Sequence, residues 1–176
     1  MAVPEAAPMQ IEVSYPESGN PPDSHFLRFF EGTHAMHRFD PKKPAAAFAL
    51  LVAPAEKRNQ RILLLPDSAI ARAEAGPSEV RNRRNTIAFL EEKRAVKKCK
   101  DGHNLSVIKH VLFPSVSRCS SCVARTNTNG WREWMVLDGS RLLPLEEAFD
   151  RSACESFNLF FYRRLPDDTL EVPFRF

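Results

Sequence analysis

Short apolar runs with strand-like alternation recur along most of the chain. Between residues 25 and 66 there are three of them, at 25–31, 45–53 and 61–66, and turn-forming segments separate them. Runs of this length bounded by such residues are typical of strands joined by tight connections. The pattern predicts a small antiparallel sheet in this part of the chain.

The pattern changes after residue 77. Ser78 is a favourable helix N-cap, and the apolar residues that follow recur at loosely helical spacing. These positions are Val80, Ile87, Leu90 and Val96. The sequence therefore predicts one principal helix over about residues 78–98.

Strand-like alternation returns over residues 104–113 and 131–137, and Asp138-Gly139 followed by 140–143 is typical of a hairpin with a two-residue turn. A short helix is expected over 145–153 after Pro144, and strands over 156–164 and 170–176. Trp131 and Trp134 would then face opposite sides of a strand, one in the core and one at its rim or exposed as a partner anchor. The predicted fold class is α+β, a small β-rich domain with one principal helix.

The first 24 residues differ from the rest because they hold five prolines and few large apolar side chains. Burial would not offset the entropy lost on ordering such a segment. We expect a flexible, proline-rich arm over 1–24 and a single domain over 25–176.

Composition narrows the class of protein. The chain has 176 residues, of which 43% are hydrophobic and 27% charged. No apolar run approaches the roughly 18 to 20 residues that cross a bilayer, and the N-terminus lacks the features of a signal peptide. We therefore expect an intracellular protein, cytoplasmic or nuclear, with no membrane partner.

The formal net charge of +3 conceals a cluster of cations. Between residues 81 and 100 eight cations stand against two anions, a local charge of +6. A segment of this kind can contact phosphates or an acidic protein surface, and it can also be a solvated helix face. The candidate partner-binding residues are Arg81, Arg83, Arg84, Lys93, Arg94, Lys97, Lys98 and Lys100.

Four potential metal ligands occur as two close pairs, Cys99 with His103 and Cys119 with Cys122, separated by fifteen residues. Tetrahedral zinc is often bound by two such pairs, each supplied from one tight turn. Because protein ligands would fill all four positions, the expected ion is one structural Zn²⁺. The alternative is unconnected buried cysteines and a surface histidine.

Residues 99–122 also resemble half of a treble-clef zinc finger of the C1 type. The resemblance rests on Cys-x-Asp-Gly-His-x-Leu over 99–105, followed by Cys-x-x-Cys at 119–122. The family's second set of ligands is absent here. The resemblance therefore implies a single zinc site and transfers no lipid or partner binding.

Residues 102–164 resemble the C-terminal part of the ubiquitin-specific protease domain. The matching features are the segment 102–109, Trp134, 137–140, Leu142 with Pro144, and 157–161. The resemblance implies that His103 is a general base and Asp138 its orienting acid. The cysteine-bearing start of that domain is not among the 176 residues, so this interpretation is a divergent, inactive or incomplete relative, and it competes with zinc for His103.

The first functional hypothesis is a non-enzymatic, zinc-stabilised binding protein that contacts a protein or nucleic acid partly through the basic segment 81–100. No small-molecule cofactor is expected, because the six glycines are scattered and form no phosphate loop. The protease-like domain is the alternative. A small viral or host-interaction accessory protein is a further one.

Overall fold

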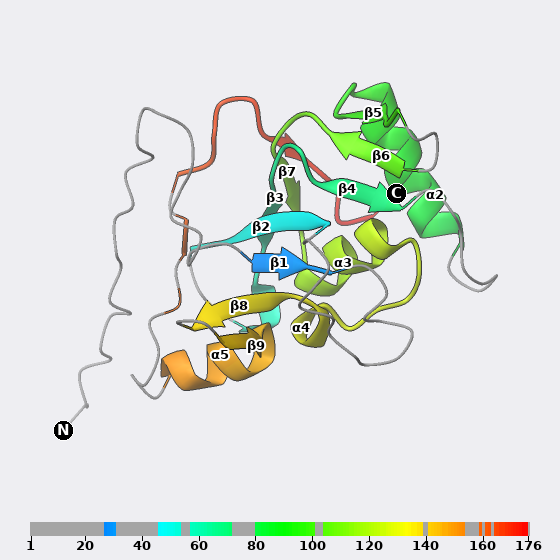
Figure 1. Ribbon diagram of the computed structural model, residues 1–176. Coiled ribbons are helices and arrows are strands. Elements are labelled where there is room, and N and C mark those ends of the chain that lie inside the picture. Colours follow the sequence, from blue (N-terminus) through cyan, green and yellow to red (C-terminus); the bar gives the residue numbers. More distant parts are fainter. Residues whose placement is uncertain are drawn as a thin grey trace.

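The computed structural model of the chain (Figure 1) is a mixed α+β fold. The structure describes residues 27–30, 46–53, 57–71, 80–100, 104–138, 141–153, 159, 161–162 and 164–175. The expected N-terminal arm, 1–24, lies outside the described residues. No helix in the described ranges is long and apolar enough to cross a membrane.

The larger of two sheets has eight strands and forms the centre of the fold. Its order is β11 (Leu170–Glu171), β7 (Val111–Phe113), β3 (Ile62–Leu64), β2 (Ala47–Val52), β1 (Leu27–Phe29), β8 (Met135–Asp138) and β9 (Arg141–Pro144). A further strand, β10 (Phe161–Tyr162), pairs in parallel with β2. The antiparallel sheet predicted over 25–66 is confirmed, because β1 pairs with β2 and β2 with β3 in antiparallel register.

The central strands are apolar at nearly every position because both faces of this sheet are covered. Ile62 and Leu64 belong to the large core beneath the helices, whereas Leu63 belongs to a smaller cluster on the opposite face. Leu165 and Tyr162 pack on that second cluster. A strand buried on both faces is read from sequence as a continuous apolar run rather than as an alternating one.

The smaller sheet contains β4 (Ala69–Ala71), β6 (Asn104–Val107) and β5 (Val96–Lys98), with β6 in the middle. The prediction of one strand over 104–113 is therefore wrong, because β6 and β7 lie in different sheets. Fully buried Ser68 joins the two sheets. Its hydroxyl exchanges hydrogen bonds with the backbone of Phe48 in β2, and its carbonyl accepts from the Val107 amide at 2.8 Å.

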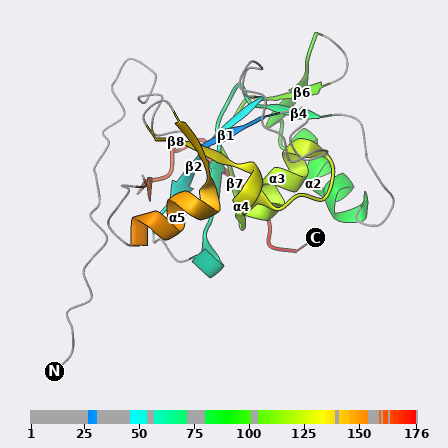
Figure 2. The same ribbon diagram turned by 60° about the horizontal axis from the view of Figure 1, so that its bottom comes forward.

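Figure 2 shows the helices in a row along one side of the strands. The row runs from α5 (Leu145–Ala153) through α4 (Gly130–Glu133) and α3 (Val116–Ala124) to α2 (Val80–Glu92), and a short 3-10 helix, η2, spans Lys57–Asn59. The helix expected over 145–153 is confirmed as α5. The expectation of one principal helix is too simple, because α3 and α5 each have nine residues beside the thirteen of α2.

The helix predicted to reach residue 98 ends at Glu92, and this boundary is a correction. Arg94 adopts the left-handed conformation with φ 54°. The Ala95 amide donates to the Leu90 carbonyl at 2.8 Å, and the Arg94 amide donates to Glu91 at 3.0 Å. These two bonds form a Schellman motif that ends the helix, so the cations that follow lie on a turn and on β5.

The strand predicted over 131–137 is also wrong in its first half. Residues 130–133 form the one-turn helix α4, and the strand β8 begins only at Met135. The hairpin itself is confirmed, because Asp138 pairs with Arg141 in the β8–β9 register. Trp134 lies at the helix C-cap and is fully buried, whereas Trp131 on α4 is partly exposed.

Candidate functional site

Most of the predicted partner-binding cations form an exposed surface at one end of the molecule. Seven of the eight are exposed, and they lie on α2, on the turn after it, on β5 and just beyond. They are Arg81, Arg84, Lys93, Arg94, Lys97, Lys98 and Lys100. We call this set the basic surface. Only Glu91 and Glu92 bring exposed negative charge to the same segment.

Arg83 does not belong to the basic surface, because only 6% of it is exposed. It shares the inward side of α2 with Thr86, Ile87 and Leu90, which lie three, four and seven residues further along the chain. This spacing places all four on one helix face. The sequence showed the charge of Arg83 but not the face on which it lies.

Cys119 and Cys122 lie one turn apart on α3 rather than in a tight turn, which corrects the local structure expected for a metal-ligand pair. Ser115 caps this helix by accepting a hydrogen bond from the Arg118 amide at 3.2 Å, and Arg125 ends it in the left-handed conformation. Both cysteines are buried in the main core. The helix therefore directs both thiols inward.

Burial dominates the chemistry of these thiols. Desolvation raises the pKa of Cys119 well above its usual value and that of Cys122 to about 12, although Arg125, Arg118 and Arg83 act on Cys122 in the opposite direction. Both side chains are thus protonated thiols at neutral pH in the metal-free protein.

The third predicted ligand, Cys99, follows β5 and is half-buried. Its amide donates to the Asn104 carbonyl at 2.9 Å. Over the described ranges no three His, Cys, Asp or Glu side chains form a group that could hold a metal, so Cys99 is not gathered with the other two cysteines. His103 lies outside the described residues, and the zinc site stays a prediction.

Of the two residues that the protease resemblance implies, Asp138 lies within the described residues and His103 does not. Asp138 ends β8 and forms an ion pair with Arg151, with 3.4 Å between Oδ2 and Nη1. Because His103 lies outside the described residues, the expected pairing of Asp138 with His103 is not placed.

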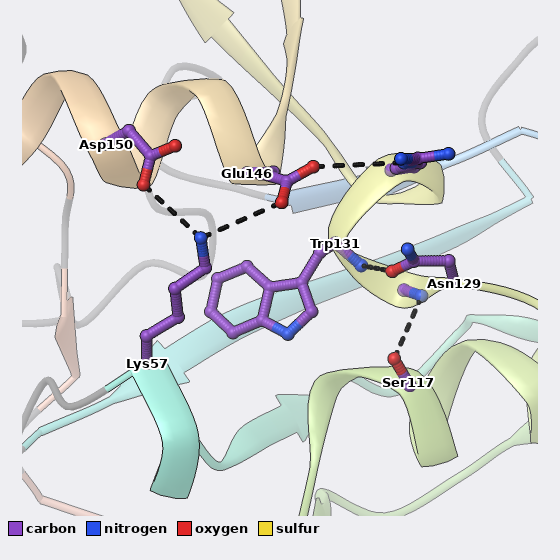
Figure 3. Close-up of polar contacts among 8 residues, drawn as sticks. Lys57, Ser117, Asn129, Trp131, Glu146 and Asp150 are labelled. Carbon is purple, nitrogen blue, oxygen red and sulfur yellow. Dashed lines mark hydrogen bonds and ion pairs between the residues drawn. The ribbon is translucent and has the colours of Figure 1, made fainter.

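A second candidate site surrounds Trp131, at the start of α4. Gly130 donates its amide to Ser117 Oγ at 3.2 Å, and Asn129 caps α4 by accepting from the Trp131 amide at 3.1 Å (Figure 3). A Cβ on Gly130 would lie only 2.5 Å from the Val116 carbonyl oxygen. Only glycine permits so close an approach of α4 to α3, and the resulting backbone contact fixes the position of Trp131.

The Trp131 ring is surrounded by charged groups and a second aromatic ring. Phe149 on α5 packs edge-on at 5.2 Å between centroids, and Lys57 Nζ lies 5.6 Å from the Trp131 ring centroid. The same Nζ is 3.3 Å from Asp150 Oδ1 and 3.7 Å from Glu146 Oε1 (Figure 3). We call these five residues the aromatic corner.

Sequence reasoning singled out Trp131 but missed the corner around it. One signal was available: Glu146 and Asp150 are four residues apart in a segment predicted to be helical, so they share a face. Lys57 could not be found in this way, since it comes from a separate element 74 residues before Trp131 in the chain.

Comparison with known proteins gives one match. No curated protein and no solved structure matches the chain. The model of the family described as a domain of unknown function, DUF4357, matches residues 46–146. This region contains the basic surface, both buried cysteines and Trp131. Since the match spans more than half of the chain, the protein belongs to the DUF4357 family.

Proposed function

We propose that this chain is a non-enzymatic interaction protein whose basic surface binds the phosphate backbone of a nucleic acid. The observation that carries the proposal is the exposure of seven cations on α2, β5 and their connections, against two exposed carboxylates. Lys and Arg side chains presented in this way bind phosphates by neutralising charge and releasing counterions.

A nucleic acid is favoured over an acidic protein because the basic surface offers few apolar side chains that could anchor a protein partner. Protein interfaces usually depend on a few buried aromatic or apolar anchors. In the part of the chain that the structure describes, Ile108 and Phe174 are the exposed large hydrophobic residues. Ile108 borders the basic surface, because its amide donates to the Ala95 carbonyl at 2.8 Å, but it is a single apolar side chain beside seven exposed cations. Charge alone is sufficient for binding to phosphates without sequence preference.

The ordinary role of lysines on an edge strand is the competing explanation. β5 is at the edge of the small sheet, and edge lysines discourage pairing with other chains. A direct binding measurement separates the two roles, because only a binding surface gives an affinity that falls steeply with salt.

The test measures the Kd for a labelled 20-base-pair DNA duplex and a 20-nucleotide RNA between 50 and 300 mM salt. The variant Arg81→Glu/Lys97→Glu/Lys98→Glu should reduce the slope of log K against log salt by about three, roughly one for each cation that no longer neutralises a phosphate. Arg81 lies in the first turn of α2, where a glutamate favours the helix, so the variant should fold.

The matched control reverses three exposed arginines outside the basic surface, Arg58→Glu/Arg141→Glu/Arg175→Glu. It changes the net charge by the same amount and should keep most of the salt slope. Equal loss of affinity in the two variants would show attraction by net charge alone, and binding to neither nucleic acid would refute the proposal. Tighter binding to a polyglutamate peptide than to both nucleic acids would favour an acidic protein.

A further inference from the structure

The aromatic corner already holds an ammonium group, the Nζ of Lys57. Two carboxylates lie within 3.7 Å of that nitrogen, and the Trp131 ring offers it a face at 5.6 Å. An aromatic face combined with nearby carboxylates is the chemistry by which proteins recognise ammonium groups.

The walls of the corner are held in place without Lys57. Trp131 is fixed by the contact of Gly130 with α3 and by the Asn129 cap, and both Trp131 and Phe149 pack against the main core. Glu146 and Asp150 lie one turn apart on α5. The two aromatic rings of the site are therefore preorganised by α4 and α5, which limits the entropy lost when a ligand binds.

Lys57 is held only weakly. Its side chain is 42% exposed, and those of Glu146 and Asp150 are 43% and 65% exposed. Ion pairs this exposed and an exposed cation–π contact are each weak, because water screens the charges. An incoming ammonium can thus replace Lys57 without disrupting the core.

We propose that the aromatic corner is a binding site for a lysine side chain of a partner protein, and that Lys57 occupies it until the partner binds. The ligand is an ammonium because the structure presents one in this position. Two carboxylates repel phosphate, so this site is separate from the basic surface, and Figure 2 shows α5 and α2 at opposite ends of the row of helices.

The test uses nuclear magnetic resonance of the indole N–H groups. The chain has two tryptophans, so the spectrum contains two indole signals, and the Trp131→Phe variant assigns them. The probe is the capped peptide Gly-Lys-Gly, and capped Gly-norleucine-Gly supplies the same stem without the charge. In the Lys57→Ala variant, the lysine peptide should shift the Trp131 signal saturably and leave Trp134 unchanged.

Three comparisons complete the design. The Lys57→Ala variant should bind the lysine peptide at least threefold more tightly than the parent, because the internal competitor is gone. Lys93→Ala is the matched control, since Lys93 Nζ lies 5.9 Å from the Phe89 ring centroid and, among the described residues, pairs with the carboxylate of Glu92 alone. It should leave the affinity unchanged. Adding Glu146→Gln and Asp150→Asn to Lys57→Ala should abolish binding.

Several results would overturn the proposal. One is the absence of a Trp131 shift in the Lys57→Ala variant, and another is an equal shift with the norleucine peptide. Tighter binding of capped Gly-Arg-Gly would refute the choice of lysine. A Trp131 shift that depends on protein concentration without peptide would assign the corner to a second copy of the chain.

Discussion

The two ends of the row of helices carry charge in opposite ways. At the α2 end, seven exposed cations face two exposed carboxylates, whereas at the α5 end Lys57 and Arg132 are paired with Glu146 and Asp150. The α2 end is a surface of nearly one sign, and the α5 end is balanced. The net charge of +3 reveals neither arrangement.

The α2 end and the α5 end also differ in the interactions on which their structure depends. The basic surface comes from one continuous segment and depends on charge, whereas the aromatic corner comes from three separate elements and depends on backbone packing between α3 and α4. Substitutions at the α5 end should therefore change stability, and charge reversals at the α2 end should change binding.

The largest effect is expected for Trp134→Ala, at the C-cap of α4. Trp134 is fully buried and packs edge-on against Phe29 at 5.3 Å. Its removal leaves a large cavity and should lower the free energy of unfolding by about 4 kcal/mol. Urea denaturation measures this, and Arg81→Glu/Lys97→Glu/Lys98→Glu should lose less than about 1 kcal/mol. Equal losses would contradict the difference between the two ends.

A somewhat smaller loss is expected for Gly130→Ala. The three atoms nearest to the added Cβ would all be backbone atoms, the closest at 2.5 Å, so α3 and α4 must move apart. This should lower the free energy of unfolding by about 3 kcal/mol. Ser117→Ala removes only the hydrogen bond to the Gly130 amide and should lose about 1 kcal/mol. If the Gly130→Ala protein were as stable as the Ser117→Ala protein, α4 could move away from α3 at little cost in free energy.

Cys122 on α3 and Cys99 beside the basic surface should respond unequally to substitution. Cys122→Ser places a hydroxyl in the apolar core and should lose about 2 kcal/mol, whereas Cys99→Ser, at a half-buried position, should lose less than about 0.5 kcal/mol. Elemental analysis of untagged protein tests the zinc prediction alongside. One zinc ion per chain, lost in both variants with equal destabilisation, would establish the predicted site and refute the unequal response.

A loss of stability is also expected at alkaline pH, and it is small only while the pH is mildly alkaline. The folded-state pKa of Cys122 is raised to about 12, and the folded protein therefore holds this proton more tightly than the unfolded chain, whose thiols titrate near about 8.5. The resulting stability is fully present below about pH 8.5 and declines as the pH rises toward 12, by at most about 1.4 kcal/mol per pH unit. Denaturation at pH 8, 9 and 10 measures the decline.

Cys122→Ala is the control for this titration, because it removes the group and keeps the site apolar. It should reduce the decline relative to the parent protein. An unchanged decline would mean that other groups, such as lysines and tyrosines, account for the alkaline loss.

Local patterns predicted the elements whose signals are contained within the element. The strands within 25–66, the β8–β9 hairpin and α5 were all found, since apolar runs, turn residues and helical periodicity are properties of neighbouring residues. The exposed cations of the basic surface were found for the same reason, with Arg83 as the exception.

The errors fall where contacts between distant segments decide the outcome. The Pro114-Ser115 sequence and the spacing of Val116, Cys119 and Val123 were compatible with a capped helix, yet the Cys-x-x-Cys spacing favoured a metal-binding turn. The alternating segment 104–113 could not show that it divides between two sheets. That division depends on two hydrogen bonds, from the Asp67 amide to the Val107 carbonyl and from the Val107 amide to the Ser68 carbonyl.

Residues adjacent in the chain are sufficient to specify the α+β composition, the positions of most strands and the cationic character of the segment 81–100. The folded chain was needed to show that Arg83 faces inward, that Cys119 and Cys122 enter the core, and that Lys57 meets Trp131. These outcomes depend on burial and packing between elements far apart in sequence, which no local pattern records.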